Sequence, residues 1–181
     1  MSEQIQPIPG DSALQVSHDA SLARRCAQGD ESALREAFEA HEPRLRGLAF
    51  RVLGNQEDAE EVAAGALLKF WKSAGRYRGE CSLRTYLTRI ALNIARDTLR
   101  RRPKSLAVGA ADAEPSEMME RIRDGMARLG EEDREVLALY YLEDTTYEEI
   151  CEVLGVSYDV LRTRLVRARR RLRQAVGAGD D

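Results

Sequence analysis

Arginine dominates one short stretch near the carboxyl end of the sequence. Residues 161–174, LRTRLVRARRRLRQ, contain seven arginines and no acidic residue. Guanidinium groups bind phosphates, because each neutralised phosphate releases counterions, and they also donate paired hydrogen bonds to the edge of guanine. The chemistry that this stretch favours is therefore nucleic-acid binding.

The residues around this stretch have the spacing of a helix-turn-helix motif. Ile150 and Leu154 precede a turn at Gly155, where only glycine adopts positive φ at low cost, and an apolar stripe then begins at Leu161. Docking geometry places the start of the second helix against base edges and its later residues against phosphates. The candidates are Tyr158, Asp159, Arg162 and Thr163 for base edges, and Arg164, Arg167, Arg170 and Arg171 for phosphates.

The alternative for this helix is a charged face that is merely solvated. Such a face usually mixes arginine with glutamate one turn away, so that the side chains pair with each other. Asp159 is the only acidic residue between positions 158 and 176. We therefore favour nucleic-acid binding.

A second basic segment lies earlier in the chain. Residues 84–104 contain seven basic side chains against the single acid Asp97. The loop before it, GRYRGECS, offers Tyr77, Gly79 and two arginines, which would suit an unstacked base and its backbone. A connecting loop with a core tyrosine explains the same residues equally well.

Other kinds of chemistry have little support in the sequence. The cysteines at 26, 81 and 151 are odd in number and widely spaced, which favours neither disulfides nor a zinc site. His18 lies near the amino terminus and His41 lies beside Pro43, and we find no paired carboxylates, activated nucleophile or phosphate-binding glycine loop. We expect no enzyme activity and no zinc site.

Helices must position these residues, because the sequence contains no strand pattern. Aromatic residues make up only 6% of the chain, while alanine, leucine, glutamate and arginine are abundant. Helices are expected from Asp19 or Ser21 to Gly29, from Asp30 to Gly54 with a bend or break at Pro43, and over 57–73, 82–102, 116–129, 131–142, 146–154 and 158–176. In the third of these, Val62, Ala66, Leu67 and Phe70 would form the buried stripe.

The expected fold is all-α, with two helical domains joined by a flexible linker. We assign residues 1–18 to a disordered tail, 19–102 to the first domain, 103–117 to the linker and 118–176 to the helix-turn-helix domain. The net charge of −3 hides acidic clusters at 57–61 and 131–135 that oppose the basic segments, so the two domains could pack together. With no targeting or membrane-spanning segment, we expect a cytoplasmic protein.

Taken together, these features resemble the extracytoplasmic-function sigma factors of bacterial RNA polymerase, over residues 19–176. The matching stretches are GDESALREAFEAHEPRLRGLA, LGNQEDAEEV, LLKFW, RYRGECSLRTYLTRIALNIARDTLRRR, REVLALYYLEDTTYEEICEVLGVS and RTRLVRARRRL. Their order and spacing around the linker make the resemblance specific.

The resemblance implies a promoter-specificity subunit that binds promoter DNA and the largest and second-largest subunits of core RNA polymerase. Residues 57–73 would dock on the polymerase clamp, the loop over 73–82 and the helix after it would hold the minus-ten element, and the second domain would read the minus-thirty-five element. The implied polymerase contacts are Asp58, Glu61, Ala64, Gly65, Leu68 and Trp71, and the implied minus-ten contacts are Tyr77, Arg78, Arg84, Arg89, Asn93, Arg96 and Arg100. An anti-sigma partner is also implied, whereas no cofactor or metal is.

The clamp-binding helix departs from the family pattern. Ala64 stands where the family usually has glutamine, and Gly65 where it has glutamate. Lineage drift is one explanation, and a weakened polymerase contact that needs an auxiliary recruiting factor is another. A sigma mimic that titrates an anti-sigma factor is a third, although it would not need the arginines of both domains. A freestanding helix-turn-helix repressor would explain only the second domain.

Overall fold

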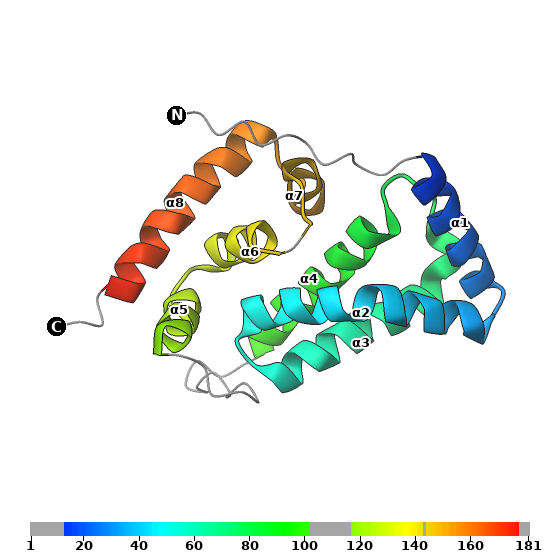
Figure 1. Cartoon of the computed structure of the whole chain (residues 1–181), viewed down its shortest axis with the longest axis horizontal. Helices are drawn as coiled ribbons and strands as arrows, with labels where there is room; N and C mark the ends of the chain where they lie inside the picture. The colour runs from blue at the N-terminus through cyan, green and yellow to red at the C-terminus, as the bar shows by residue number, and fades with distance from the viewer. Residues whose placement is uncertain (1–12, 102–116, 143, 178–181) are drawn as a thin grey trace.

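The computed structural model describes residues 13–101, 117–142 and 144–177, and throughout these ranges the regular structure is helical (Figure 1). The helices are α1 (Ala13–Ala27), α2 (Glu31–Leu53), α3 (Gln56–Ser73), the short 3-10 helix η1 (Ala74–Arg76), α4 (Leu83–Arg101), α5 (Glu117–Ala127), α6 (Glu131–Tyr140), α7 (Tyr147–Leu154) and α8 (Tyr158–Gly177). The all-α prediction is confirmed. The predicted linker lies outside the described residues except for Glu117, which begins α5.

Local signals in the sequence set several of these helix ends. The Asp30 carboxylate accepts hydrogen bonds from the first turn of α2, and Gly54 ends that helix in the left-handed conformation with φ 68°. Thr146 and Glu149 cap the start of α7 reciprocally. Gly155 ends α7 with φ 65°, as the turn of the helix-turn-helix requires. These predicted ends are therefore confirmed.

Two local expectations need correction. No break occurs at Pro43: α2 continues through it, because Leu45 and Leu48 on the next turn are fully buried and their packing outweighs one missing backbone donor. The helix α1 begins at Ala13, so the last residues of the expected tail are helical. Asp19 is not its cap but a buried residue inside it, whose Oδ2 accepts a hydrogen bond of 2.8 Å from the backbone N–H of Leu83, the first residue of α4.

The first four helices pack around an alanine- and leucine-rich core. The predicted stripe of α3 is buried in full, ending at Phe70, whose ring meets Tyr86 of α4 edge-on at 6.3 Å. Small residues such as Ala63 and Ala66 let α3 lie close to its neighbours. This packing fixes one face of α4 against the core and leaves its arginines on the other.

The last four helices form the second domain. Leu161, Leu165 and Ala168 bury one stripe of α8 against α6, as the sequence predicts. The helix α5 crosses α8 so closely that a Cβ added at Gly125 would lie 2.8 Å from Cγ2 of Val176. The arginines of α8 therefore lie on the other faces of the helix, some of them beside α6 and some exposed.

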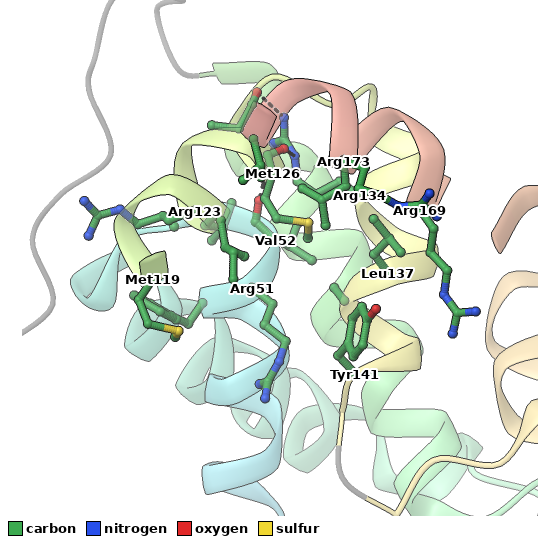
Figure 2. Close-up of a pocket in the computed structure, with 18 residues that line it drawn as sticks. Arg51, Val52, Met119, Arg123, Met126, Arg134, Leu137, Tyr141, Arg169 and Arg173 are labelled. Carbon is green, nitrogen blue, oxygen red and sulfur yellow. Dashed lines mark hydrogen bonds between the residues drawn. The ribbon is translucent and has the colours of Figure 1, made fainter. Parts of the chain in front are cut away.

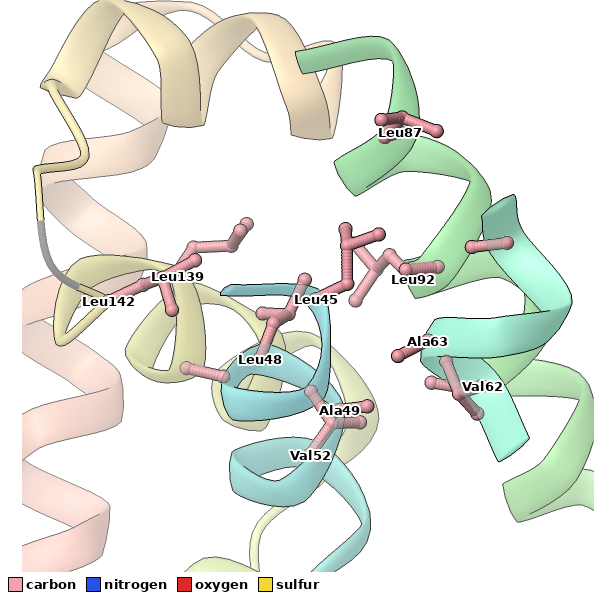
Figure 3. Packing of buried hydrophobic residues seen from close by; sticks show 14 of the residues in the cluster. Leu45, Leu48, Ala49, Val52, Val62, Ala63, Leu87, Leu92, Leu139 and Leu142 are labelled. Carbon is pink, nitrogen blue, oxygen red and sulfur yellow. The ribbon is translucent and has the colours of Figure 1, made fainter. Parts of the chain in front are cut away.

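The two domains also pack on each other. In Figure 1, α6 and α7 face α2 and α4 across the middle of the molecule, and α2 contacts α6 while α4 contacts α7. Leu139 of α6 and Leu142, which follows that helix, approach Leu45 and Leu48 of α2 (Figure 3), so that one buried apolar cluster runs through both domains. The arginines of α4 consequently lie beside the second domain.

Candidate nucleic-acid interface

The arginines of α4 are held by the acidic residues of α6 and α7. Arg84 Nη2 lies 2.5 Å from Glu149 Oε1, and Arg89 Nη2 donates to the backbone carbonyl of Glu152 at 2.6 Å. Further along α4, Arg96 donates two hydrogen bonds to the Glu135 carboxylate, at 2.5 and 2.8 Å, and Arg100 reaches Glu131 at 3.5 Å. The sequence predicts the arginines and the acidic cluster separately, but it does not predict that they meet.

The Arg96–Glu135 pair is the most buried of these contacts. The Glu135 side chain is 6% exposed and that of Arg96 is 29% exposed. The paired hydrogen bonds to Glu135 raise the pKa of Arg96 further above its ordinary value, although burial opposes this. Asn93, one turn earlier, is exposed and accepts a hydrogen bond from Arg96. Arg96 therefore stays charged at physiological pH.

The loop before α4 holds its tyrosine inside the protein. Tyr77 is half-buried, its hydroxyl donates to the carbonyl of Cys81 at 2.7 Å, and its ring packs edge-on against Tyr86 at 5.4 Å. Arg78 beside it is exposed, and Gly79 adopts a positive φ of 71°. The loop thus combines a packed aromatic residue with an exposed guanidinium.

Acidic residues of α6 also bind the later part of α8. Asp133 is 1% exposed and accepts hydrogen bonds from Arg167, at 3.0 Å, and from Arg171. Burial alone would raise the pKa of Asp133, but the two guanidinium groups hold it below its usual value. Glu132 lies 3.8 Å from Arg164. Three of the four predicted phosphate contacts therefore also bind α6.

The start of α8 is exposed, as a base-reading helix requires. Tyr158, Asp159, Arg162 and Thr163 are all exposed, and so is Arg170 further along. The Thr163 hydroxyl donates to the carbonyl of Asp159 one turn earlier, at 2.9 Å. The Tyr158 ring lies 5.6 Å from that of Tyr147, which supports it from α7. These side chains lie at the start of α8, just after the turn at Gly155 that connects it to α7.

Comparisons with known proteins identify this arrangement. The family model for sigma-70 region 2 matches residues 37–104, and the family model for sigma-70 region 4 matches residues 119–172. The sequence is 30% identical to the RNA polymerase sigma factor CarQ of Myxococcus xanthus, over 84% of this chain and 94% of that protein. The chain belongs to the sigma-70 family, among its extracytoplasmic-function members. Its function is accordingly that of a sigma factor, the subunit that directs RNA polymerase to initiate transcription at promoters.

Two further comparisons agree with this identification. The RNA polymerase sigma-H factor of Pseudomonas aeruginosa is 29% identical, over 87% of this chain and 93% of its own length. Among solved structures, CnrH in complex with the cytosolic domain of CnrY matches with a TM-score of 0.71 and 24% identity, over 90% of this chain and 99% of that one. RpoE of Bartonella quintana, in complex with the anti-sigma factor NepR, matches with a TM-score of 0.65, 19% identity and coverage of 79% and 96%. The two structures share the fold of this sigma factor.

The predicted polymerase-binding residues of this sigma factor lie on α3. Glu61 and Leu68 are exposed, the latter by 46%, and Asp58 and Trp71 are half-buried. Ala64 and Gly65 are also half-buried. A Cβ added at Gly65 would meet Ile94 of α4 at 3.6 Å, which is ordinary contact. The helix therefore has room for a Cβ at position 65.

A groove that the sequence does not predict lies between α2, α5, α6 and α8. Figure 2 shows its apolar lining, which includes Met119, Met126, Leu137 and Tyr141 and encloses about 660 Å³. Arginines surround this lining at positions 51, 123, 134, 169 and 173. Arg134 donates to carbonyls of both domains, including that of Val52 at 3.3 Å. Only the spatial arrangement brings these distant residues together.

Within the described parts of the chain, no cluster of three or more histidine, cysteine, aspartate or glutamate side chains has the arrangement of a metal site. Over the same residues, no helix combines the length and the apolar character needed to cross a membrane.

Proposed function

We propose that this sigma factor binds core RNA polymerase through the exposed side of α3, the minus-ten element through α4 and the loop before it, and the minus-thirty-five element through the start of α8. The observation that carries the proposal is that α4 and α8 each present a row of arginines outside the packed core. Guanidinium rows of this kind bind phosphates, and exposed residues at the start of a recognition helix reach base edges.

The residues in these roles are those expected from the sequence. We assign polymerase binding to Asp58, Glu61, Ala64, Gly65, Leu68 and Trp71; minus-ten binding to Tyr77, Arg78, Arg84, Arg89, Asn93, Arg96 and Arg100; and minus-thirty-five binding to Tyr158, Asp159, Arg162, Thr163, Arg164, Arg167, Arg170 and Arg171. The domain boundaries that we propose are 19–102, preceded by the start of α1, and 118–176, with the linker over 103–117. Nucleotide addition stays with the polymerase, and we assign no catalytic residue or cofactor to this chain.

An anti-sigma factor is the regulatory partner that we propose. CnrH and RpoE, which share this fold, were both solved as complexes, the latter with an anti-sigma factor. The groove between the two domains supports such a partner, because apolar side chains would fill it while acidic ones would meet the surrounding arginines. We place the protein in the cytoplasm, where polymerase and promoters meet.

Polymerase binding tests the role of α3. We expect wild-type protein to bind purified core polymerase and Leu68→Asp to bind about tenfold more weakly, because burying a leucine contributes about 1.5 to 3 kcal/mol. Leu68 is exposed, so its replacement leaves the fold intact. A matched control is Val166→Asp, which replaces another exposed apolar residue on α8. Equal affinities of the two variants would contradict the assignment of α3.

A second pair of changes tests the need for an auxiliary recruiting factor. We expect Ala64→Gln with Gly65→Glu to change the affinity for core polymerase by less than about threefold, since polar contacts that stay partly accessible to water contribute little. A Cβ at position 65 makes only ordinary contact with Ile94, at 3.6 Å. An affinity at least tenfold higher in the double variant would instead indicate that the natural residues weaken the clamp contact, and a recruiter would then be required.

A further inference from the structure

Four of the five arginines of α4 contact acidic residues of the second domain. Arg84 and Arg89 contact Glu149 and Glu152 of α7, whereas Arg96 and Arg100 contact Glu135 and Glu131 of α6. These four arginines are the ones to which we assign the minus-ten element. We propose that the acidic face formed by Glu131, Glu135, Glu149 and Glu152 is an intramolecular competitor of promoter DNA, which occupies the α4 arginines in the free sigma factor. This inference rests on the proposed function, since it takes these arginines as DNA contacts.

The Glu149 carboxylate is fixed by its own helix, α7, independently of its contact with α4. Its Oε2 accepts a hydrogen bond from the backbone N–H of Thr146 at 3.0 Å, which completes the cap of α7. Its Oε1 is left to receive Arg84, from Nε at 2.8 Å. A carboxylate fixed by its own helix loses little side-chain entropy on binding a guanidinium, so the contact is stronger than that of a mobile surface pair.

Glu135 presents the geometry that a phosphate would present. Its two oxygens face two nitrogens of Arg96, which is the paired arrangement that guanidinium groups also form with phosphate oxygens. The carboxylate is 6% exposed, so water competes weakly for it. The same nitrogens cannot bind Glu135 and a DNA phosphate at once. Promoter DNA must therefore displace α6 from α4.

In addition to the ion pairs, apolar packing stabilises the contact between the two domains. Leu142, just after α6, lies against α2, where a Cβ added at Gly47 would be 3.9 Å from the Leu142 Cδ1. Arg44 of α2 also donates to the Thr145 hydroxyl at 2.7 Å. Polymerase binding by both domains would have to separate these contacts, and it would thereby release α4 for the promoter.

The test measures DNA binding by the full-length protein with and without polymerase. The variant is Glu135→Gln with Glu149→Gln, because glutamine keeps the oxygen that caps α7 while it removes both charges. The control is Glu120→Gln with Glu148→Gln, which makes the same change in net charge at two exposed positions. The DNA is a fork with a single-stranded minus-ten segment, followed by fluorescence anisotropy, and thermal unfolding verifies that each variant is folded.

We expect the free Glu135→Gln, Glu149→Gln variant to bind this DNA about tenfold more tightly than the control variant, because two paired carboxylates no longer compete with phosphate. In complex with core polymerase the two variants should bind equally, within about twofold, since the domains are then already apart. Small-angle scattering of the free protein should show a larger radius of gyration in the first variant only.

Arg100→Ala separates the two possible failures, because this exposed arginine can be removed without disturbing the core. If Arg100→Ala weakens DNA binding by the holoenzyme while the glutamate variant binds like its control, α4 contacts the promoter and the competition is refuted. If Arg100→Ala leaves holoenzyme binding unchanged, the proposed role of α4 fails and the competition fails with it.

Discussion

Asp133 shows how one buried carboxylate organises part of the DNA-binding helix. It lies in the first turn of α6, where the helix dipole favours negative charge, and it binds Arg167 and Arg171 of α8. Both arginines are also assigned to DNA phosphates, so Asp133 orients them before DNA arrives. Burial without these partners would be costly, which makes the three residues one structural unit.

We expect Asp133→Asn to lower the free energy of unfolding at pH 7 by about 2 kcal/mol, because hydrogen bonds to a charged group contribute about 1.5 to 3 kcal/mol. The folded state holds the pKa of Asp133 below its usual value. Its contribution is therefore complete above about pH 5 and is lost as the pH falls below the unfolded pKa of about 3.9. Urea unfolding at pH 7 and at pH 3.5 should show the difference between wild type and variant shrinking at the lower pH.

Glu132→Gln is the control for this prediction. Glu132 precedes Asp133 and also contacts Arg167, but its side chain is 62% exposed. Exposed ion pairs contribute little, so its replacement should change the free energy of unfolding by less than about 0.5 kcal/mol. A loss of stability in Asp133→Asn that is equal at both pH values would contradict a charged Asp133.

The sequence predicts that the arginines lie on the polar faces of helices, but it does not predict which side chains they pair with. Arg96 and Glu135 lie 39 residues apart, and Arg167 and Asp133 lie 34 apart. Their pairing depends on how α6 packs between α4 and α8, which no local pattern encodes. The helix starts at Asp30 and Thr146 could be predicted, because the donor and acceptor of each cap are neighbours in the chain.

At the scale of the helices, two glycines occupy opposite environments. Gly65 lies in the middle of α3, where an added Cβ would lie 3.6 Å from Ile94, whereas at Gly125 in α5 it would lie only 2.8 Å from Val176 of α8. Glycine weakens any helix interior through its backbone freedom. Its presence at position 125 has a packing reason, because it lets two helices approach. No such reason applies at position 65.

We expect Gly65→Ala to raise the free energy of unfolding by about 0.5 to 1 kcal/mol and Gly125→Ala to lower it by about 1 to 3 kcal/mol. The first change adds helix propensity without a clash, and the second forces α5 away from α8. Urea unfolding of the two variants against wild type measures both effects. Equal effects of the two substitutions would contradict the close approach of α5 to α8.

At the scale of the whole molecule, the buried cluster that joins the domains should make unfolding cooperative. We expect one urea transition for wild type, because Leu142 and its neighbours couple α6 to α2. Leu142→Asp would place a carboxylate in that contact and split the transition into two. Its neighbour Tyr141 is 55% exposed, so Tyr141→Asp should keep a single transition. Two transitions in the wild-type protein would refute the coupling.

The two helical domains were predictable from helix period and turn residues, and their contact was not. Opposite charges on 84–104 and 131–135 permitted an association, but they did not specify its register. The groove beside α5 was not predicted for the same reason, since Arg51 of α2 and Tyr141 line one groove only when the two domains pack together. The local sequence pattern does not predict contacts between residues of different domains.

The hydrogen bond between Asp19 and Leu83 has a consequence for any shortened form of the protein. The region 2 match starts at residue 37, so a fragment cut at that point would keep every residue assigned to the minus-ten element and lose the carboxylate that caps α4. Removal of the first helix by a protease would then fray the first turn of α4, where Arg84 lies. Loss of the amino-terminal helix would thus weaken binding to the promoter.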